Sequence, residues 1–460
     1  MKIGFTLRDI VKATGGKLLR GNPDMQVESL STDSRTILPG QLFIPLAGER
    51  FDGHDYLSAA LARNAVACLC KQEFVEKAGG YSGVILVKDT LLALQAIALA
   101  HRRKFSFRVV ALTGSCGKTM VKELAAVIVS TKYHTLASAG NVNNEVGLPL
   151  QVLNLLPEHE AAVLELGTNH PGELEVLCRI AKPTAGIWTN VGMGHIGYFG
   201  SLEQIQKEKS ALVKAIPPDG LMILNADDPL VMATKSLCKG KIVTYGLDSP
   251  ADYKAEDIAV DADGVSFTVQ DVEVRSGLVG KHSISNILAA LALGTEWGIS
   301  LGDGAKAVAS VIPLGRRLAV VNLRSITLID DCYNSNPNSL AAALQILHDH
   351  PAVRRIAVLG DMNELGAHAI PAHKAGGEAA AQLGMDRLYL IGDFAPFYQE
   401  GALLAGMYPG SIRVFATKEE LTGELMSEIY NGDVILVKAS RAMGLETISD
   451  AIKCNWGEEL

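Results

Sequence analysis

Between residues 108 and 124 the chain reads Arg108-Val-Val-Ala-Leu-Thr-Gly-Ser-Cys-Gly-Lys-Thr-Met-Val-Lys-Glu-Leu124. Residues 109–112 form a short apolar run that predicts a buried strand, and residues 121, 124 and 128 are apolar at helical spacing. Gly114 and Gly117 lie between these two parts. A strand, a glycine turn and a helix in this order are typical of a loop that binds phosphate groups at a helix N-terminus.

The residue types in this turn suit a nucleoside triphosphate. Backbone amides of the loop converge on an anion, the lysine adds a positive charge, and the threonine hydroxyl reaches a magnesium ion on the phosphates. The residues concerned are Gly114, Ser115, Cys116, Gly117, Lys118 and Thr119. The match to the general phosphate-loop pattern is partial, because Leu112 stands where that pattern has a glycine. A glycine turn without nucleotide is the less favoured alternative.

Length and composition limit the class of protein. The chain has 460 residues, of which 48% are hydrophobic, 20% are charged and 45 are glycine, and this combination predicts about three α/β domains. The net charge of −8 provides no general attraction for nucleic acid. Seven scattered cysteines without Cys-x-x-Cys spacing favour reduced thiols and argue against zinc.

The apolar runs of the sequence indicate where in the cell the protein is expected. The first residues have no apolar run behind their positive charges, and the longest apolar helical run, residues 91–100, is too short to span a bilayer. We therefore expect a cytoplasmic protein without membrane insertion.

We predict three domains. Residues 1–84 form a small mixed α/β domain, residues 85–313 a central domain with a parallel sheet around the phosphate loop, and residues 314–460 a Rossmann-like domain. An apolar strand at 84–87 and a helix at 90–104 are expected to lead into the phosphate-loop strand. The segment Pro313-Leu-Gly-Arg-Arg317 marks the second boundary.

The C-terminal domain alternates strands and helices. Strands are predicted at residues 326–329, 355–359, 388–391, 412–415 and 434–437. No Gly-x-Gly-x-x-Gly sequence follows the first of them, so dinucleotide binding is not supported.

Polar side chains follow the predicted strands of the central domain. Glu165 ends the strand at 161–166, and His195 lies in the glycine-rich loop after the strand at 186–189. Because the carboxyl ends of parallel strands meet at one edge, these side chains and Thr119 could bind one or two magnesium ions there. Each of them alone also has a structural explanation. A helix at 201–213 carries Lys207 and Lys209, which by composition alone predict a solvated face.

Several short motifs occur in a fixed order along the chain. They are Thr113-Gly-Ser-Cys-Gly-Lys-Thr119, Asn141-x-Asn-Asn144, Glu165-Leu-Gly167, Thr189-Asn-Val-Gly-x-x-His195, Gly315-Arg316 and Asp331-Cys-Tyr-Asn-Ser-Asn-Pro337. Together they resemble the Mur ligase family, over residues 31 to 446. The last motif, with Leu359-Gly-Asp-Met-Asn-Glu-Leu-Gly366 and Val437-Lys-Ala-Ser-Arg441, is most similar to the members that add D-alanyl-D-alanine.

The resemblance implies an ATP-dependent, ADP-forming ligase of peptidoglycan synthesis, and hence of cell wall biogenesis, cell shape and division. Such an enzyme joins D-alanyl-D-alanine to the carboxylate of UDP-N-acetylmuramoyl-tripeptide through an acyl phosphate, with Mg²⁺, in the cytoplasm and as a monomer. It also implies ATP bound between the central and C-terminal domains. The third residue of the peptide, diaminopimelate or lysine, is not determined by the sequence.

The resemblance also assigns roles to individual residues. Catalysis and charge stabilisation fall to Lys118, Lys209, His195 and Arg316. Nucleotide binding falls to Gly114 to Thr119, Asn286, Arg316 and Asp331, and metal binding to Thr119, Glu165, His195 and Lys209. Lys209 lies fourteen residues after His195, where several relatives carry a carbamylated lysine. The UDP pocket is assigned to Ser31, Ser34, Arg35, Gly48, Arg50, Asp52 and His54, and the remaining substrate contacts to Asn141, Asn143, Asn144, Tyr333, Asn334, Lys438 and Arg441.

Two other functions stay open at this point. One is another ligase of the same superfamily, which adds a single amino acid to a UDP-muramoyl chain or glutamate to folate. The other is a P-loop switch or motor whose ATP hydrolysis moves a partner; it gives the N-terminal domain no role.

Overall fold

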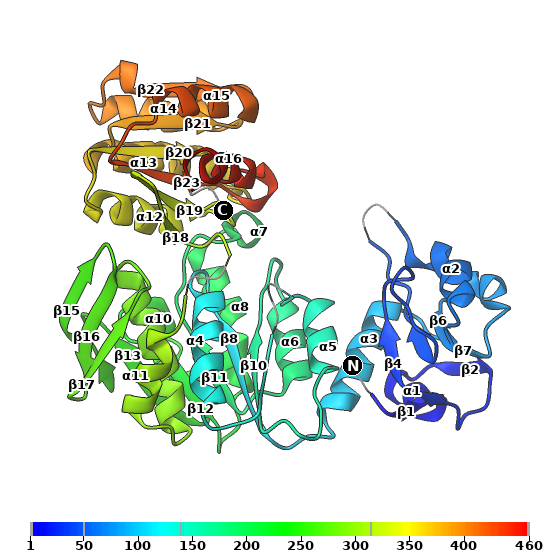
Figure 1. Cartoon of the computed structure of the whole chain (residues 1–460). Coiled ribbons are helices and arrows are strands. Elements are labelled where there is room, and N and C mark those ends of the chain that lie inside the picture. Colours follow the sequence, from blue (N-terminus) through cyan, green and yellow to red (C-terminus); the bar gives the residue numbers. More distant parts are fainter. Residues whose placement is uncertain (1–2, 49–50, 139, 141, 313–314, 458–460) are drawn as a thin grey trace.

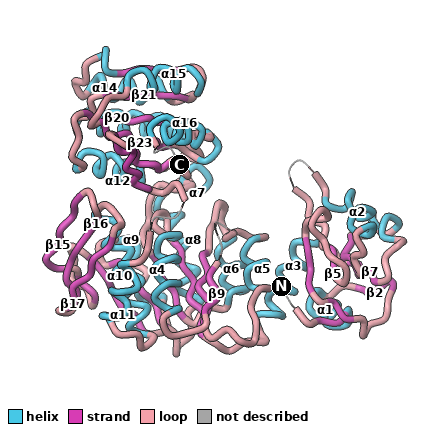
Figure 2. Tube along the Cα trace, viewed as in Figure 1, coloured by secondary structure: helices cyan, strands magenta, loops and turns pink. Residues whose placement is uncertain are grey.

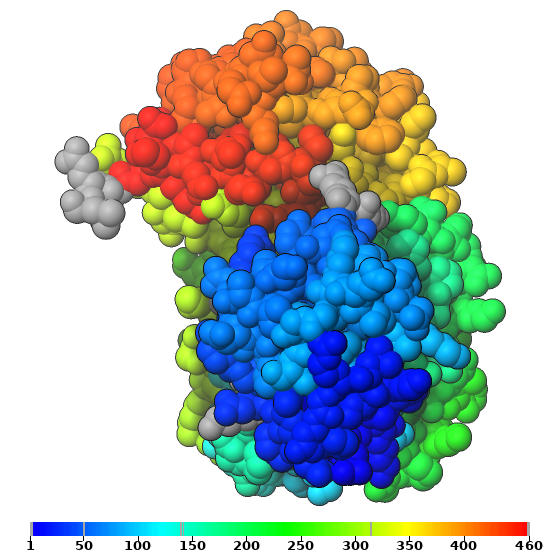
Figure 3. Space-filling view, turned by 90° about the vertical axis from the view of Figure 1, so that its right-hand side faces the viewer, coloured from blue at the N-terminus to red at the C-terminus, as the bar shows by residue number. Residues whose placement is uncertain are grey.

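The computed structural model describes residues 3–48, 51–138, 140, 142–312 and 315–457, and these form three α/β units in chain order (Figure 1). The N-terminal unit lies beside the central unit and the C-terminal unit lies above it. Seen from the side of the N-terminal unit, the C-terminal unit again lies above the other two (Figure 3). The predicted three-domain α/β fold is therefore confirmed. In the described ranges, no helix is both long and apolar enough to cross a membrane.

The N-terminal unit has a mixed sheet in the order β2-β7-β6-β5-β4. All neighbours in it are parallel except β2 and β7. Its strands are β2 (Lys17–Arg20), β4 (Ser29–Ser31), β5 (Gln41–Phe43), β6 (Ala67–Cys70) and β7 (Gly83–Leu86), accompanied by the pair β1 (Phe5–Thr6) and β3 (Gln26–Val27) and by helices α1 (Leu7–Thr14) and α2 (Leu57–Ala62).

One strand belongs to a different sheet from the one expected. The apolar run at 84–87 was expected to lead into the central domain, but it forms β7, which pairs with β6 and β2. The predicted boundary at residue 84 therefore falls inside β7. An apolar run predicts a strand without naming its neighbours, because pairing is decided by tertiary contacts. The predicted second boundary, at 313, lies outside the described residues, and the domain limits stay predictions.

The central unit is built on a parallel sheet in the order β14-β13-β12-β11-β8-β10-β9. Its strands are β8 (Arg108–Thr113), β9 (Thr135–Ala137), β10 (Ala161–Glu165), β11 (Ala185–Trp188), β12 (Leu221–Asn225), β13 (Lys241–Gly246) and β14 (Tyr253–Lys254). The phosphate-loop strand, β8, lies between β11 and β10. The strands predicted at residues 109–112, 161–166 and 186–189 are confirmed as β8, β10 and β11, whereas β9, β13 and β14 were not predicted.

Helices cover both faces of this sheet (Figure 2). Alternate residues of β8 point to opposite faces, so that Val109 and Ala111 lie in one hydrophobic core and Val110 and Leu112 in the other. The first core includes α3 (Thr90–Arg102), α5 (Gly147–Val152), α6 (Glu173–Ala181) and α8 (Leu202–Ala215). The second includes α4 (Lys118–Ser130), α10 (Lys281–Glu296) and α11 (Leu301–Ala309).

Smaller elements complete the central unit. Helices α7 (Ile196–Phe199) and α9 (Pro229–Met232) follow the carboxyl ends of β11 and β12. The strands β15 (Glu256–Asp261), β16 (Gly264–Val269) and β17 (Val272–Ser276) form an antiparallel sheet at the edge of the unit (Figure 1).

The C-terminal unit has a sheet in the order β18-β19-β23-β20-β21-β22, which is parallel except for the pair β18 and β19. Its strands are β18 (Ala319–Leu323), β19 (Ile326–Asp331), β20 (Arg354–Leu359), β21 (Arg387–Ile391), β22 (Ile412–Phe415) and β23 (Asp433–Lys438). One face packs on α12 (Pro337–Asp349), α13 (Ala369–Gln382) and α14 (Ala395–Leu404), the other on α15 (Lys418–Glu428) and α16 (Glu446–Trp456). The five predicted strands are confirmed, and β18 was missed.

Helix α3 joins the N-terminal and central units into one core. Leu94 and Ile97 are buried in a hydrophobic cluster that also contains Phe5 of the N-terminal unit and Val109 of the central sheet. Lys104, just after α3, donates from Nζ to the carbonyl oxygen of Ile3 at 2.8 Å. The two units are therefore expected to move as one body.

This shared core gives a stability prediction. Replacing Leu94, which is fully buried, by alanine should lower the free energy of unfolding by about 2–5 kcal/mol through lost apolar burial and a residual cavity. Leu92→Ala on the same helix removes a side chain that is 61% exposed. It should change the free energy of unfolding by no more than about 0.5 kcal/mol. Calorimetric unfolding of both variants tests this, and equal effects would contradict it.

Candidate active site

The phosphate loop can be built only with glycine at two positions. Gly114 has φ +153° and a Cβ there would lie 1.9 Å from Thr189 Oγ1. Gly117 has φ +81° and a Cβ there would lie 2.5 Å from Asn286 Oδ1 on α10. Both are therefore required by a left-handed backbone and by a close neighbour. Among the residues described, no side chain caps α4, which leaves its first amides for an anion.

The loop after β11 holds the phosphate loop in place. The Ser115 amide donates to Asn190 O at 3.1 Å and the Cys116 amide to Asn190 Oδ1 at 2.8 Å. Thr189 Oγ1 donates to Cys116 O at 2.6 Å, and the Gly192 amide donates to Ser115 Oγ at 2.8 Å. The loop is thus held in shape by its neighbour.

Lys118 is held over the same loop. Its Nζ donates to Gly114 O at 2.7 Å and to Ser115 O at 3.4 Å. Burial lowers its pKa, an effect that the Glu165 carboxylate opposes. The ammonium therefore lies among the groups that would contact the phosphates.

A cleft of about 1110 Å³ lies between the central and C-terminal units, and it contains most of the predicted site. The predicted residues that line it are Ser115, Cys116, Gly117, Lys118, Thr119, Asn143, Asn144, Glu165, His195, Asn286, Asp331, Tyr333, Asn334, Lys438 and Arg441. Of the other residues predicted here, Gly114, Lys209 and Arg316 do not line it, and Asn141 is outside the described residues.

Glu165 carries an unsatisfied oxygen in this cleft. The residue is 1% exposed, and its Oε1 accepts from Asn143 Nδ2 at 2.8 Å. Its Oε2 is buried and has no hydrogen-bond partner within the described part of the chain. A buried carboxylate oxygen without a partner is costly unless a cation neutralises it. A hard divalent cation therefore fits this position.

The kind of cation follows from the surrounding donors. No three His, Cys, Asp or Glu side chains of the described residues are grouped as a metal site. Mg²⁺ binds through one or two protein oxygens and completes its shell with water and phosphate oxygens. Glu165 and Thr119 fit Mg²⁺ on this ground.

His195 reaches across to the C-terminal unit. It precedes α7 with φ +62°, a conformation uncommon for residues other than glycine. Its Nδ1 lies 2.5 Å from Oε2 of Glu364, which follows β20, and this contact lowers the pKa of Glu364. Glu364 also lines the cleft and was not predicted.

The position of Lys209 differs from the expectation that the helix at 201–213 presents both of its lysines, Lys207 and Lys209, to solvent. On α8, Lys207 is exposed, but Lys209 is 3% exposed because its side chain points inward from the buried face of the helix. Burial, and then the charge of Lys118, lowers the pKa of Lys209 to about 7. Composition cannot distinguish the two lysines, because the buried face depends on what α8 packs against.

The C-terminal side of the cleft holds a buried ion pair and an aromatic ring. Lys438 Nζ donates to Asp331 Oδ2 at 2.6 Å and to Asn334 O at 2.9 Å. The guanidinium carbon of Arg317 lies 3.9 Å from the centre of the Tyr333 ring, and that of Arg441 lies 5.7 Å from it. Arg317 also lines the cleft and was not predicted.

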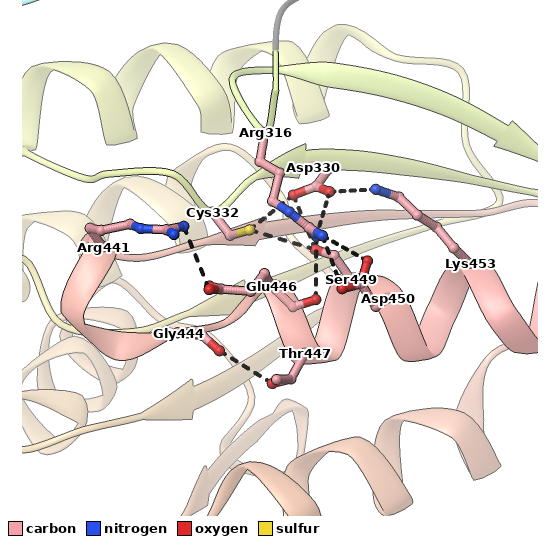
Figure 4. A network of polar contacts seen from close by, with 10 residues as sticks. All are labelled: Arg316, Asp330, Cys332, Arg441, Gly444, Glu446, Thr447, Ser449, Asp450 and Lys453. Carbon is pink, nitrogen blue, oxygen red and sulfur yellow. Dashed lines mark hydrogen bonds and ion pairs between the residues drawn. The ribbon is translucent and has the colours of Figure 1, made fainter. Parts of the chain in front are cut away.

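Arg316 is not in the cleft, contrary to the prediction. Its guanidinium points toward β19 and α16, where it contacts Asp330 at 3.2 Å, Asp450 at 2.8 Å and the carbonyl oxygen of Glu446 at 3.3 Å (Figure 4). Asp330 is fully buried and also accepts from Lys453 Nζ at 2.6 Å. A buried carboxylate attracts the nearest cation, which explains why Arg316 turns away from the nucleotide side.

His282 at the start of α10 is a further cleft residue that was missed. Burial, reinforced by the charge of Lys438, lowers its pKa to about 4, so its ring is neutral at physiological pH. The signal in the sequence was its position four residues before Asn286 on one helix face.

The predicted UDP pocket lies in the N-terminal unit, apart from the cleft. Arg35 is exposed and pairs with Asp33 at 2.8 Å. His54 is fully buried, stacked on Phe74 with ring centres 4.2 Å apart and with Nδ1 2.6 Å from Asp52. Its ring belongs to the interior of the unit, and its assignment as a ligand contact stays a prediction. Ser31, Ser34 and Gly48 lie in the described part, whereas Arg50 lies outside it.

Comparison with protein families gives matches over nearly the whole chain. Residues 26–102 match the catalytic domain model of the Mur ligase family, residues 112–294 the Mur ligase middle domain, and residues 316–441 the Mur ligase glutamate ligase domain. Each of these segments covers most strands of the main sheet of its unit.

Individual proteins match over their full lengths. The UDP-N-acetylmuramoyl-tripeptide–D-alanyl-D-alanine ligase of Bacillus subtilis is 35% identical over 96% of this chain and 97% of its own. The crystal structure of MurF from Acinetobacter baumannii superimposes with a TM-score of 0.91 at 30% identity, over 98% of this chain and 99% of its own. MurF ligase from Thermotoga maritima, solved in complex with ADP, superimposes with a TM-score of 0.84 at 26% identity. The match covers 94% of this chain and 98% of its own. With family models matched in order along the chain and a relative of this identity and coverage, the chain belongs to the Mur ligase family.

Proposed function

We propose that this chain is the ATP-dependent ligase that joins D-alanyl-D-alanine to the carboxylate of UDP-N-acetylmuramoyl-tripeptide, giving the pentapeptide precursor of peptidoglycan. The observation that carries the proposal is the cleft, in which the phosphate loop of the central unit faces Asp331, Tyr333 and Lys438 of the C-terminal unit. Relatives that match over nearly the whole length of both chains, and that are named for this reaction, support it.

The chemistry requires activation of a carboxylate. A carboxylate oxygen attacks the γ-phosphorus of ATP, the bond to ADP breaks, and an acyl phosphate forms. The amine of D-alanyl-D-alanine then attacks the acyl carbon, phosphate leaves, and the ammonium proton is lost to a base or solvent. Both steps build negative charge on phosphate oxygens, so the protein must supply fixed positive charge and hydrogen-bond donors.

The groups around the phosphate loop meet that requirement. The amides at the start of α4 and the Lys118 ammonium bind the β- and γ-phosphates. Mg²⁺, held by Thr119 and Glu165 with His195, would neutralise phosphate charge and align the oxygens for transfer. Asn286 and Asp331 lie at the two sides of the nucleotide position, on α10 and at the end of β19.

The C-terminal unit closes the site against water. Asn336, the N-cap of α12, contacts Cys116 Sγ at 3.4 Å, and Asn338 Oδ1 accepts from the Met193 amide at 3.1 Å. These contacts bring the two units together around the cleft. Water exclusion protects the acyl phosphate from hydrolysis. We propose that the enzyme acts as a monomer in the cytoplasm, where ATP and the UDP-linked peptide are available.

A substrate assay distinguishes this proposal from its alternatives. Phosphate release should require both UDP-N-acetylmuramoyl-tripeptide and D-alanyl-D-alanine, with diaminopimelate and lysine tripeptides compared side by side. Turnover with single amino acids instead of the dipeptide would favour another ligase of the superfamily. Rapid ATP hydrolysis without the UDP substrate would favour a P-loop switch or motor.

Lys209 is proposed to act as a carbamate. At an ordinary lysine pKa only roughly one amine in a thousand is neutral near pH 7.5, but with the pKa lowered to about 7 most of the amine is neutral there and open to CO₂. Activity should therefore fall when bicarbonate is removed, and the fall should be larger at pH 6.5 than at pH 8.

Substitution tests the same proposal. Lys209→Ala should lower turnover by about 10–100-fold, and acetate or formate should restore part of it by occupying the vacated position. Lys207→Ala, on the exposed face of the same helix, is the control and should leave turnover unchanged. Normal turnover in Lys209→Ala without added acid would decide against the carbamate.

Arg317 is proposed to supply the cation previously assigned to Arg316. Arg317→Ala should lower kcat by about 10²–10³-fold, the usual loss when one donor to a developing anion is removed. Arg316→Ala should instead lower stability by about 1–3 kcal/mol, because Asp330 and Asp450 lose a partner. Steady-state kinetics and calorimetry on both variants separate the roles; loss of kcat in Arg316→Ala at unchanged stability would restore the original assignment.

A further inference from the structure

The loop that carries His195 packs on a loop of the C-terminal unit. The amide of Gly197 donates to the carbonyl oxygen of Glu364 at 2.8 Å. A Cβ on Gly197 would lie 2.6 Å from the amide nitrogen of Gly366, so the two backbones are too close for a side chain at this position. The backbone of the central unit at Gly197 is therefore in direct contact with the backbone of the C-terminal unit at Glu364 and Gly366.

Helix α7, which follows His195, belongs to the C-terminal core by its packing. Ile196 and Phe199 are buried in the hydrophobic cluster that contains Met362 and Leu365. These apolar contacts, together with the Gly197 bond, tie the segment after β11 to the C-terminal unit, although its sequence belongs to the central unit.

Glu364 is held firmly from its own side. The amide of Asn363 donates to Ser440 Oγ at 2.7 Å, and the amide of Met362 donates to Nε2 of the buried His373 at 2.8 Å. The position of Glu364 is therefore set by the C-terminal unit.

The two side chains meet through an unusual pair of backbone conformations. His195 has φ +62° and Glu364 has φ +64°, and such values are maintained only where the surrounding structure enforces them. They bring His195 Nδ1 to 2.5 Å from Glu364 Oε2. A nitrogen this close to a carboxylate carries the ring proton, which leaves the lone pair on Nε2. Nδ1 is buried and has no hydrogen-bond partner besides this carboxylate among the described residues.

We propose that Glu364 is a positioning residue that holds the His195 ring in the metal-binding tautomer and thereby couples the position of the C-terminal unit to Mg²⁺ binding. A ring that donates from one nitrogen to a carboxylate presents the other nitrogen to a metal with fixed orientation and raised basicity. The inference rests on the proposed function for its metal. On this proposal the metal site is complete only while the C-terminal unit contacts residues 195–197.

Binding of Mn²⁺, used as the probe for Mg²⁺, tests the proposal in enzyme loaded with a non-hydrolysable ATP analogue. Free Mn²⁺ is measured by electron paramagnetic resonance in Glu364→Leu, Glu364→Gln, His195→Asn and the double variant Glu364→Leu/His195→Asn. Glu364→Leu should weaken Mn²⁺ binding by about tenfold. Glu364→Gln should weaken it less, because the amide oxygen still accepts from Nδ1–H. In the His195→Asn background, Glu364→Leu should change binding by less than about twofold.

Two controls make the result specific. Glu400→Gln removes the same charge from the same unit at an exposed pair with Lys374, 2.6 Å apart, and should leave Mn²⁺ binding unchanged. Nitrogen NMR of metal-free enzyme labelled at histidine should show a protonated Nδ1 for His195 in the wild type and the more common Nε2-protonated tautomer in Glu364→Leu.

The outcomes separate this inference from the proposed function. The role of Glu364 would be overturned if Glu364→Leu weakened Mn²⁺ binding equally in the wild-type and His195→Asn backgrounds. It would also be overturned if both Glu364 variants were active and bound Mn²⁺ as the wild type does. A wild type without phosphate release on both substrates would overturn the function instead.

Discussion

The structure depends on how the uncapped start of α4 is held at the carboxyl end of β8. A helix N-terminus carries amides without internal partners and a partial positive charge, and it binds an anion well only if the preceding loop keeps its shape. Here the loop after β11 maintains that shape through Thr189, Asn190 and Gly192. Gly114 and Gly117 permit the close approach. The parallel sheet places these loops side by side, so the sheet order is the origin of the site.

Charge in the cleft is arranged around that loop. Lys118 in the cleft and Lys209 close to it are amines whose pKa is lowered by burial, while Glu165 is a buried carboxylate with one unsatisfied oxygen. Each of these groups is costly to bury alone, and a bound nucleotide with its cation would offset the cost. The C-terminal unit adds Arg317 and the Asp331–Lys438 pair, so neither unit has a complete site by itself.

The three units differ in how they are connected. The N-terminal and central units share a hydrophobic core through α3, which predicts a rigid connection. The C-terminal unit is joined to the central unit by polar contacts at Asn336 and Asn338, by the Glu364 contact, and by the small apolar contact of α7. Interfaces of this more polar kind permit relative motion.

The sequence by itself determined the phosphate loop, most strands of the central and C-terminal sheets and the family, because these depend on local patterns: apolar runs, glycine positions and ordered motifs. It also gave most of the cleft correctly, since the carboxyl ends of parallel strands converge. It could not decide which lysine of α8 is buried, that His54 points inward, or that Arg316 turns to Asp330 while Arg317 lines the cleft. These depend on contacts between residues far apart in sequence. Only the tertiary structure could bring Glu364 to His195, because the packing of one unit on another leaves no signal in the local sequence of either.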